Sequence, residues 1–400
     1  MFESLELAPA DPILGLGEAF TRDPNPQKIN LSVGIFKDAQ GKTPVLDCVK
    51  EAERRLLVGE ASKSYLPITG APAFGEAVQR MVLGESHPAL GAGRAFTAHC
   101  PGGTGALRVA GDFLHAKFPG SAIWLSDPTW ENHANVFQAA GLAVRTYPYF
   151  DRARNALAFD ALLEALGRVP AGDAVLLHGC CHNPTGQDPT PEQWDAIARV
   201  LEQRRALPLI DFAYQGFGDT PEDDARGVRL LADRLPEALI CSSFSKNFGL
   251  YNERVGALTV LARDAQAAAK AFSHVKRSIR ANYSNPPSHG ASVVSTILQD
   301  ATLKGQWAAE LTAMRERIHA MRRLFRESLD ARGIALPGGD NGFITRLKGM
   351  FSFSGLNPEQ VERLRSQHAI YVVGSGRINV AGMSEGTMDR LCAGLKAVLA

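Results

Sequence analysis

Short apolar segments alternate with helix-forming segments through the middle of this chain, and no other sequence feature restricts its fold as strongly. Each apolar segment is too short for a typical helix and is bounded by turn-forming residues, which indicates a buried strand. We expect such strands at residues 121–125, 143–147, 174–177, 207–210 and from 238 onward. Helical patterns between them, for example at 160–166 and 190–205, predict a mostly parallel sheet with helices on both faces. The expected fold class is therefore α/β.

The length of 400 residues suits one large domain and one smaller domain. Apolar residues recur at three- and four-residue steps from 310 to 330, so we expect a long helix that bridges the two domains. A small α+β unit follows it, and a strand expected at 28–36 could pair into that unit. The predicted divisions are an N-terminal arm at 1–12, a discontinuous small domain at 13–45 and 314–400, and a large domain at 46–313.

Composition and charge exclude several classes of protein. The chain carries 43 basic and 42 acidic residues, a net charge of +1, so no global charge attracts it to nucleic acid or to an anionic membrane. No segment approaches the ~20 apolar residues of a membrane span, and the first residues lack the basic and apolar parts of a secretory signal. The six cysteines include no Cys-x-x-Cys pair. We therefore expect a cytoplasmic protein with reduced thiols and no metal site.

Polar and aromatic residues directly follow several of the expected strands. In an open α/β sheet the carboxyl ends of parallel strands meet at one edge, and ligands bind at this edge. Taken singly, each such residue has an ordinary structural explanation, such as a turn cap or a packed core side chain. The residues that the sequence brings to this edge are Trp130, Asn183, Asp211, Tyr214 and Lys246.

Together these residues supply the groups that hold the ring of pyridoxal phosphate. The amine of Lys246 can react with the cofactor's aldehyde once burial and nearby positive charge lower its pKa. The carboxylate of Asp211 can keep the pyridine nitrogen protonated, so that the ring accepts electrons. Tyr214 and Asn183 offer hydrogen bonds to the ring oxygen, and Trp130 offers an aromatic face. The set therefore predicts a pyridoxal-phosphate site.

A glycine-rich segment at 100–105 precedes an apolar-periodic run at 106–118. Free backbone amides and the helix dipole make the start of a helix a seat for phosphate. The segment does not match the P-loop, which continues with Gly-Lys-Ser/Thr, nor the dinucleotide motif, because Arg108 stands at the third glycine. With hydroxyls and a guanidinium added, the predicted phosphate ligands are Gly103, Thr104, Ser243 and Arg254.

Several longer segments carry a resemblance to a known enzyme family. They are 101–108, 182–186, 211–217, 243–254, 280–287 and 375–377. In this order they resemble the motifs of the fold-type I pyridoxal-phosphate aminotransferases of class I, subgroup alpha, which include aspartate and aromatic aminotransferases. The likeness runs from about Asp11 to the C-terminus. It implies a large domain with a mostly parallel, seven-stranded-type sheet, a smaller α+β domain, and pyridoxal 5'-phosphate as the cofactor.

The resemblance also implies roles for the residues at the sheet edge. Lys246 would be the Schiff-base lysine, and the expected catalytic residues are Lys246, Asp211 and Tyr214. Asp211 would be the partner of the pyridinium nitrogen, and His133 resembles the histidine that supports this aspartate. Tyr214 and Asn183 would donate hydrogen bonds to the ring oxygen.

Substrate recognition follows from the same resemblance. Arg377 resembles the family's clamp for the α-carboxylate, for which a planar bidentate donor is suited. Arg280 resembles an arginine that reaches a distal carboxylate from the partner subunit, and Tyr65 resembles a tyrosine that crosses to the partner's phosphate. These roles imply a homodimer with shared active sites. The expected substrate-binding set is Gly34, Trp130, Asn183, Arg280 and Arg377.

The implied reaction moves the amino group of L-aspartate or glutamate to a 2-oxo acid such as 2-oxoglutarate, with ping-pong kinetics. Residues that resemble the aspartate-preferring members are Lys37, Thr43, Thr104 and Asn285. Residues that depart from the usual aspartate-type pattern are Ile35, Ser64 and Pro67. Aromatic amino acid aminotransferase activity, or dual specificity, therefore stays open as the alternative.

Two readings from other classes are weaker. A nucleotide-binding α/β protein could use the loop at 102–105, but the full glycine fingerprint and an acidic residue suited to a ribose are absent from the sequence. A non-catalytic relative that keeps the fold for binding would be expected to have lost Lys246 or Asp211, and both are present.

Overall fold

A seven-stranded sheet lies at the centre of the structure, a computed structural model that describes residues 2–7 and 14–399. Its strand order is β2-β10-β9-β8-β7-β3-β4. The strands are β2 (Ala95–Pro101), β3 (Ala122–Asp127), β4 (Ala143–Pro148), β7 (Ala174–His178), β8 (Leu207–Phe212), β9 (Ala238–Ser243) and β10 (Val255–Leu261). Only β10 runs antiparallel to its neighbours, and the remaining pairs are parallel. The expected mostly parallel sheet is confirmed, although β2 and β10 were not among the expected strands.

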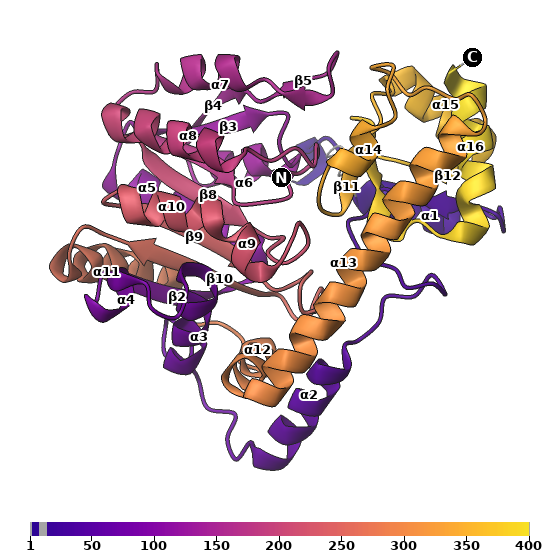
Figure 1. Cartoon of the computed structure of the whole chain (residues 1–400). Helices are drawn as coiled ribbons and strands as arrows, with labels where there is room; N and C mark the ends of the chain where they lie inside the picture. Colours follow the sequence, from indigo (N-terminus) through magenta and orange to yellow (C-terminus); the bar gives the residue numbers. More distant parts are fainter. Residues whose placement is uncertain (1, 8–13, 400) are drawn as a thin grey trace.

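Helices cover both faces of this sheet (Figure 1). One layer consists of α5 (Gly102–Lys117), α6 (Asn132–Ala139) and α11 (Ala265–Asn282), and the other of α7 (Phe159–Leu166), α8 (Pro191–Arg204) and α10 (Arg226–Arg234). Strand β7 shows why its sequence is continuously apolar. Leu176 packs into the core on the first face, whereas Val175 and Leu177 pack into the core on the second. A strand buried on both faces cannot alternate with polar residues.

The remaining elements of the larger unit lie around the sheet in Figure 1. They are α2 (Asp47–Gly59), α3 (Pro72–Leu83), α4 (Pro88–Gly91), α9 (Pro221–Asp224), α12 (His289–Gln299) and the pair β5 (Phe150–Asp151) and β6 (Ala156–Leu157). Helix α8 begins with a capping box, in which Thr190 and Gln193 satisfy each other's backbone amides. We expected the glycine-rich segment to be a loop that precedes the helix. Helix α5 instead begins at Gly102, so most of this segment forms the first helical turn.

A smaller unit packs beside the upper end of the long helix (Figure 1). Its elements are α1 (Leu14–Arg22), β1 (Ile29–Asn30), α14 (Phe343–Arg346), β11 (Phe351–Phe353), α15 (Pro358–His368), β12 (Ile370–Tyr371), β13 (Arg377–Asn379), η2 (Val380–Gly382) and α16 (Glu385–Leu399). Strand β1 pairs with β12, and β11 pairs with β13. The N-terminal segment therefore joins C-terminal elements.

The strand expected at 28–36 is much shorter than the sequence indicated, because only Ile29 and Asn30 pair as a strand. The side-chain oxygen of Asn30 accepts hydrogen bonds from the amide and the hydroxyl of Ser32, at 3.0 and 2.7 Å. Such a local turn competes with the strand ladder. The chain leaves β1 at this point and continues as an irregular segment through Gly34, which lines the cavity described below.

Helix α13 (Ala301–Asp330) connects the two units and crosses Figure 1 diagonally. It begins nine residues before the expected start at 310, because Asp300 caps it and accepts a hydrogen bond from the amide of Leu303 at 2.9 Å. Arg280, the first residue of the family-like segment 280–287, lies in the last turn of α11. The expected domain limits stay predictions. Of the arm expected at 1–12, a short 3-10 helix at Phe2–Ser4 is described, whereas positions 1 and 8–12 lie outside the described residues. None of the described helices is both long and apolar enough to cross a membrane.

Candidate active site

A cavity of about 500 Å³ lies at the carboxyl edge of the sheet and is lined by residues of both units. Strands β8 and β9, the start of α5 and strand β13 all contribute to it. The predicted residues that the structure brings together here are Gly34, Gly103, Thr104, Trp130, Asn183, Asp211, Tyr214, Ser243, Lys246, Arg254 and Arg377. The chain brings these positions together from both ends of the sequence.

Lys246 follows strand β9 and is held by the residue next to it. The side chain of Asn247 donates a hydrogen bond to the carbonyl of Gln215 at 3.1 Å. The carbonyl of Asn247 accepts one from the indole of Trp307 at 2.8 Å. The amine of Lys246 lies 5.1 Å from the centre of the Tyr214 ring. Helix α13 therefore anchors the turn that carries the lysine, and this leaves the amine at the cavity.

Burial lowers the pKa of Lys246 to about 8, because the charged ammonium is poorly solvated in the cavity wall. The positive charges of Arg254 and Arg377 lower this pKa further, whereas the carboxylate of Asp211 opposes the shift. A primary amine with a pKa near 8 is neutral in an appreciable fraction of molecules at neutral pH. Lys246 can therefore act as a nucleophile or as a base under ordinary conditions.

A pH titration of the cofactor-free protein should reveal this shift directly. We expect an amine-selective acylating reagent to modify Lys246 with a midpoint near pH 8, since only the neutral amine reacts. Peptide mass spectrometry at each pH measures the modified fraction. The Arg254→Met variant should move the midpoint upward and Asp211→Asn should move it downward, because each removes one of the charges that act on Lys246. A midpoint in the folded protein at the ordinary lysine pKa of 10.5 would contradict the assignment.

Asp211 ends a chain of hydrogen bonds whose two ends fix the proton positions. The backbone N–H of Asn183 can only donate a hydrogen bond, and it donates to Nδ1 of His178 at 3.3 Å. The Nε2 atom of His178 lies 3.1 Å from the Thr129 hydroxyl, which lies 2.8 Å from Nδ1 of His133. The Nε2 atom of His133 lies 3.0 Å from the Asp211 carboxylate, which can only accept while ionised. Each group in this chain therefore donates its hydrogen bond to the next one, in the order Asn183, His178, Thr129, His133 and Asp211.

The same chain keeps the Asp211 carboxylate ionised. Burial by itself raises the pKa of Asp211, but the hydrogen bond from His133 and the nearby charge of Lys246 act in the opposite direction, and the pKa lies below its ordinary value. Burial lowers the pKa of His178 to about 3, so this ring is neutral. A buried ionised carboxylate at the cavity wall fits a ligand with a protonated ring nitrogen.

The sequence reasoning missed several residues of the site, among them Thr129, His178 and Glu131. Thr129 and His178 complete the hydrogen-bond chain to Asp211, and Glu131 lies beside Arg377. Only the positions of these residues in the sequence could have indicated them, because His178 ends strand β7 and the other two residues flank Trp130. A single chain offers no indication that these side chains meet.

One end of the cavity has the shape and donors of an anion seat. A β-carbon at Gly102 would lie 2.4 Å from Nη2 of Arg254, and one at Gly256 would lie 2.2 Å from the carbonyl carbon of Gly102. Only glycine fits at these two positions. Arg254 donates to the hydroxyl of Ser245 at 3.2 Å, and Thr104 and the first amides of α5 border the same end. A helix N-terminus, hydroxyls and a guanidinium match a phosphate dianion.

Arg377 lies on β13 with 1% of its surface exposed. Its guanidinium donates to the carbonyl of Ser32 at 2.8 Å and to the side-chain oxygen of Asn183 at 3.1 Å. Glu131 lies 3.5 Å from Nη1, and the Phe351 ring lies 4.4 Å from Cζ. The Nε atom is buried and has no hydrogen-bond partner within the described chain. The guanidinium is thus fixed in place and still has donor capacity for a carboxylate.

Two predicted residues lie away from the cavity. Tyr65 is 93% exposed. Arg280 is exposed at the end of α11, where its guanidinium contacts the hydroxyl of Ser284. Neither residue lines the cavity of its own chain. Their predicted roles need a second subunit and stay predictions.

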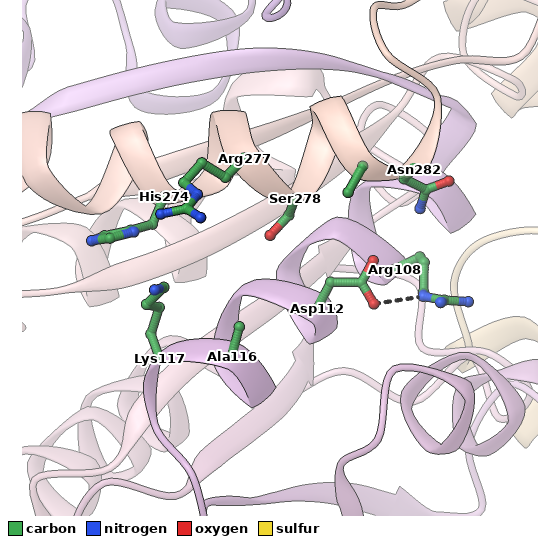
Figure 2. A pocket seen from close by; sticks show the side chains of 9 residues that line it. Arg108, Asp112, Ala116, Lys117, His274, Arg277, Ser278 and Asn282 are labelled. Carbon is green, nitrogen blue, oxygen red and sulfur yellow. Dashed lines mark hydrogen bonds and ion pairs between the residues drawn. The ribbon is translucent and has the colours of Figure 1, made fainter.

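A cavity of about 530 Å³ between α5 and α11 contains none of the predicted residues (Figure 2). Lys117, His274 and Arg277 gather near one end, and an ion pair between Arg108 and Asp112, at 2.8 Å, lies near the other. Lys117 and Arg277 are exposed, and solvated cations of this kind are common on protein surfaces. We therefore place the chemistry in the cavity at the sheet edge.

Comparisons with known proteins agree with this geometry. Residues 26–395 match the family model described as aminotransferase class I and II. The chain is 53% identical to an aspartate aminotransferase of Escherichia coli K12 over the full length of both chains. It is 49% identical to an aromatic-amino-acid aminotransferase of Pseudomonas aeruginosa, covering 100% of this chain and 99% of the relative.

A solved structure gives the same result for the fold. The aromatic-amino-acid aminotransferase of Burkholderia pseudomallei, described as covalently bound to pyridoxal phosphate, superposes with a TM-score of 0.96 at 45% identity. All of both chains is covered. The likeness in sequence and fold extends over the whole length, including both units and the cavity between them. The chain therefore belongs to the class I and II aminotransferases.

Proposed function

We propose that this protein is a pyridoxal-phosphate-dependent transaminase that moves the amino group of L-aspartate or L-glutamate to a 2-oxo acid such as 2-oxoglutarate. The observation that carries the proposal is the placement of Lys246, with its lowered pKa, in one cavity with Asp211 and Arg377. This set combines a reactive amine, an ionised carboxylate and a fixed guanidinium. Transamination of an amino acid on this cofactor requires these three groups.

The residues of the chain divide the work of the reaction. Bound pyridoxal phosphate would supply an electron sink for negative charge at the α-carbon of the amino acid. Asp211 holds a proton on the ring nitrogen, and His133 keeps that carboxylate ionised and oriented. Lys246 takes the proton from the α-carbon as a general base. Arg377 binds the α-carboxylate and so orients the α-carbon beside the lysine.

The preference for a dicarboxylate donor rests on Arg280. Its guanidinium would meet the distal carboxylate of aspartate from a neighbouring subunit. Aromatic or dual specificity is the second candidate, because a relative named for aromatic amino acids shares 49% of the sequence. An aromatic side chain carries no charge, so Arg280 would have to leave the pocket, since burying it unpaired is costly.

The visible absorbance of the purified protein tests both levels of the proposal. We expect a cofactor band that borohydride fixes covalently to the peptide containing Lys246. Separate additions of L-aspartate and L-phenylalanine then compare the donors by the rate at which each changes the band. Rapid change with aspartate alone supports the dicarboxylate preference, whereas equal rates indicate dual specificity. Absence of a fixable band on Lys246 would remove the cofactor assignment.

We further infer that the active form is a homodimer in which each subunit completes the other's site. Support comes from the exposure of Tyr65 and Arg280, both of which lie outside the cavity of their own chain. Exposed apolar side chains near the N-terminus, Phe2 and Leu5, also suit an arm that packs on a second copy.

Hybrid dimers test this shared site. The Lys246→Ala and Arg280→Ala variants should each be inactive or weak toward dicarboxylates. After their subunits are mixed and exchanged, each hybrid contains one site with both native residues. We expect recovery of about a quarter of the wild-type activity, because half of the randomly formed dimers are hybrids with one intact site. Native mass spectrometry confirms exchange, and exchanged dimers without recovered activity would rule out a shared site.

We also propose the domain limits stated above, with an arm at 1–12, a small domain at 13–45 and 314–400, and a large domain at 46–313. The pairing of β1 with β12 and of β11 with β13 supports a discontinuous small domain. A cytoplasmic location is proposed as well, and it agrees with buried, unpaired cysteines at all six positions.

A further inference from the structure

Arg322 is a fully buried arginine on α13, with 1% of its surface exposed. No acidic side chain pairs with it within residues 2–7 and 14–399. Its guanidinium instead donates to backbone carbonyls, at 2.8 Å to Ile344, 3.1 Å to Lys348, 2.8 Å to Gly349 and 2.5 Å to Phe351. Burial lowers the pKa of Arg322 only to about 10, so the group is charged at neutral pH. A buried charge without a counterion is costly and needs these carbonyl dipoles.

The segment held by Arg322 packs tightly against the loop that carries Asn183. The amide of Lys348 donates to the carbonyl of Gly186 at 3.0 Å. A β-carbon at Gly186 would lie 2.8 Å from the carbonyl oxygen of Lys348, and one at Gly349 would lie 2.4 Å from the β-carbon of Cys181. The two loops therefore have almost no freedom to shift against one another.

The last carbonyl bound by Arg322 belongs to Phe351, which lines the cavity and touches several predicted site residues. Its ring lies 4.4 Å from Cζ of Arg377 and 5.9 Å from the centre of the Tyr214 ring. A β-carbon at Gly34 would lie 2.6 Å from the tip of the same ring. Strand β11 begins at Phe351 and pairs with β13, with Phe353 opposite Arg377. A displacement of Phe351 would therefore also displace Arg377, through the contact between the two side chains and through the pairing of β11 with β13.

We propose that Arg322 is a positioning residue for substrate recognition, which sets the place of Phe351 and, through it, the guanidinium of Arg377. Arg322 contacts neither substrate nor cofactor in this assignment. The inference rests on the proposed function in one respect, namely that Arg377 binds the carboxylate of the substrate. Arginine is required because its planar fork reaches separate carbonyls at once, whereas lysine presents its donors from a single point.

The test compares Arg322→Met and Arg322→Lys in the full-length, cofactor-loaded protein. We expect Arg322→Met to lower kcat/KM for L-aspartate by about 10- to 100-fold, chiefly through KM, because a shift of about 1 Å in a positioning group has effects of this size. The dissociation constant of maleate, an unreactive dicarboxylate, should rise by a similar factor. Arg322→Lys should restore part of the loss. The matched control is Arg323→Met, an exposed neighbour on the same helix, which should change neither quantity.

A second variant separates positioning from general damage. If Arg322 acts through Phe351, then Arg322→Lys and Phe351→Ala will have non-additive effects on maleate affinity. The affinity of the cofactor-free protein for pyridoxal phosphate should stay within about 2-fold of wild type, because the phosphate end of the cavity lies on the larger unit. Should Arg322→Met not fold, the Arg322→Lys and Phe351→Ala pair decides the question.

Either of two results overturns the inference. One is unchanged maleate affinity in a folded Arg322 variant. The other is an equal loss of maleate and cofactor affinity together with additive effects of Phe351→Ala, which indicates a purely structural role. Failure of the proposed function looks different, since wild-type protein would then bind no maleate competitively with aspartate.

Discussion

Replacement of Lys246 by alanine is expected to lower kcat by about 10⁴-fold or more, because the variant loses both the covalent amine and the general base. Asp211 and Arg377 are not altered, so cofactor and substrate still bind. Steady-state transamination with L-aspartate and 2-oxoglutarate measures the loss. A small primary amine in the buffer should restore part of the activity in proportion to its concentration, since the truncated side chain leaves space at the cavity for it.

The matched control is Lys270→Ala, which removes an exposed lysine on α11 and should leave kcat unchanged. Absorbance after dialysis shows how much cofactor each variant retains. A Lys246→Ala protein that keeps more than about a tenth of the wild-type kcat would refute the assignment, because general-base catalysis alone is worth about 10²- to 10⁴-fold.

The Asp211→Asn variant is expected to lose about 10³-fold in kcat. The amide cannot hold a proton on the ring nitrogen, and removing a preorganised electrostatic group from a buried site costs on this order. The carboxamide is nearly the same size, so the expected fall is in kcat and not in KM. The Asp211→Glu variant keeps the charge but displaces it by one methylene, and its activity should lie between that of wild type and Asp211→Asn.

Two comparisons make this prediction specific. Asp160→Asn removes an exposed carboxylate from the first turn of α7 and should have no effect on kcat. Thr129→Ala interrupts the hydrogen-bond chain between His178 and His133, and we expect a smaller loss than for Asp211→Asn because the carboxylate remains. If Asp211→Asn and Thr129→Ala were equally active, the carboxylate would not be the group that acts on the ring.

Local sequence patterns were sufficient for much of the fold. Helices α7 and α8 lie within one residue of the ranges expected at 160–166 and 190–205, at Phe159–Leu166 and Pro191–Arg204. Their limits depend on signals within one or two turns, such as the capping box of Thr190 and Gln193 at the start of α8. Several buried strands were equally predictable, because a strand covered by helices on both faces is an uninterrupted run of apolar residues in the sequence.

Longer elements were less predictable because distant contacts decide them. Helix α13 extends back to Ala301 through the cap at Asp300, while its first turns pack against α2 and α12. Strand β1 ends at Asn30, whose side-chain oxygen accepts a hydrogen bond from the amide of Ser32. The roles proposed for the cavity residues stay predictions, although the structure does bring most of these residues to one place.

The sequence by itself determined the kinds of chemical groups at the site, because residues that follow buried parallel strands must meet at one edge of the sheet. Lys246, Asp211 and Tyr214 were found in this way. Only the tertiary structure decided how these groups are held. The donor chain from Asn183 to Asp211 and the carbonyl cluster around Arg322 join residues from separate segments. Local periodicity carries no information about such contacts, since they depend on how the elements pack and not on which elements form.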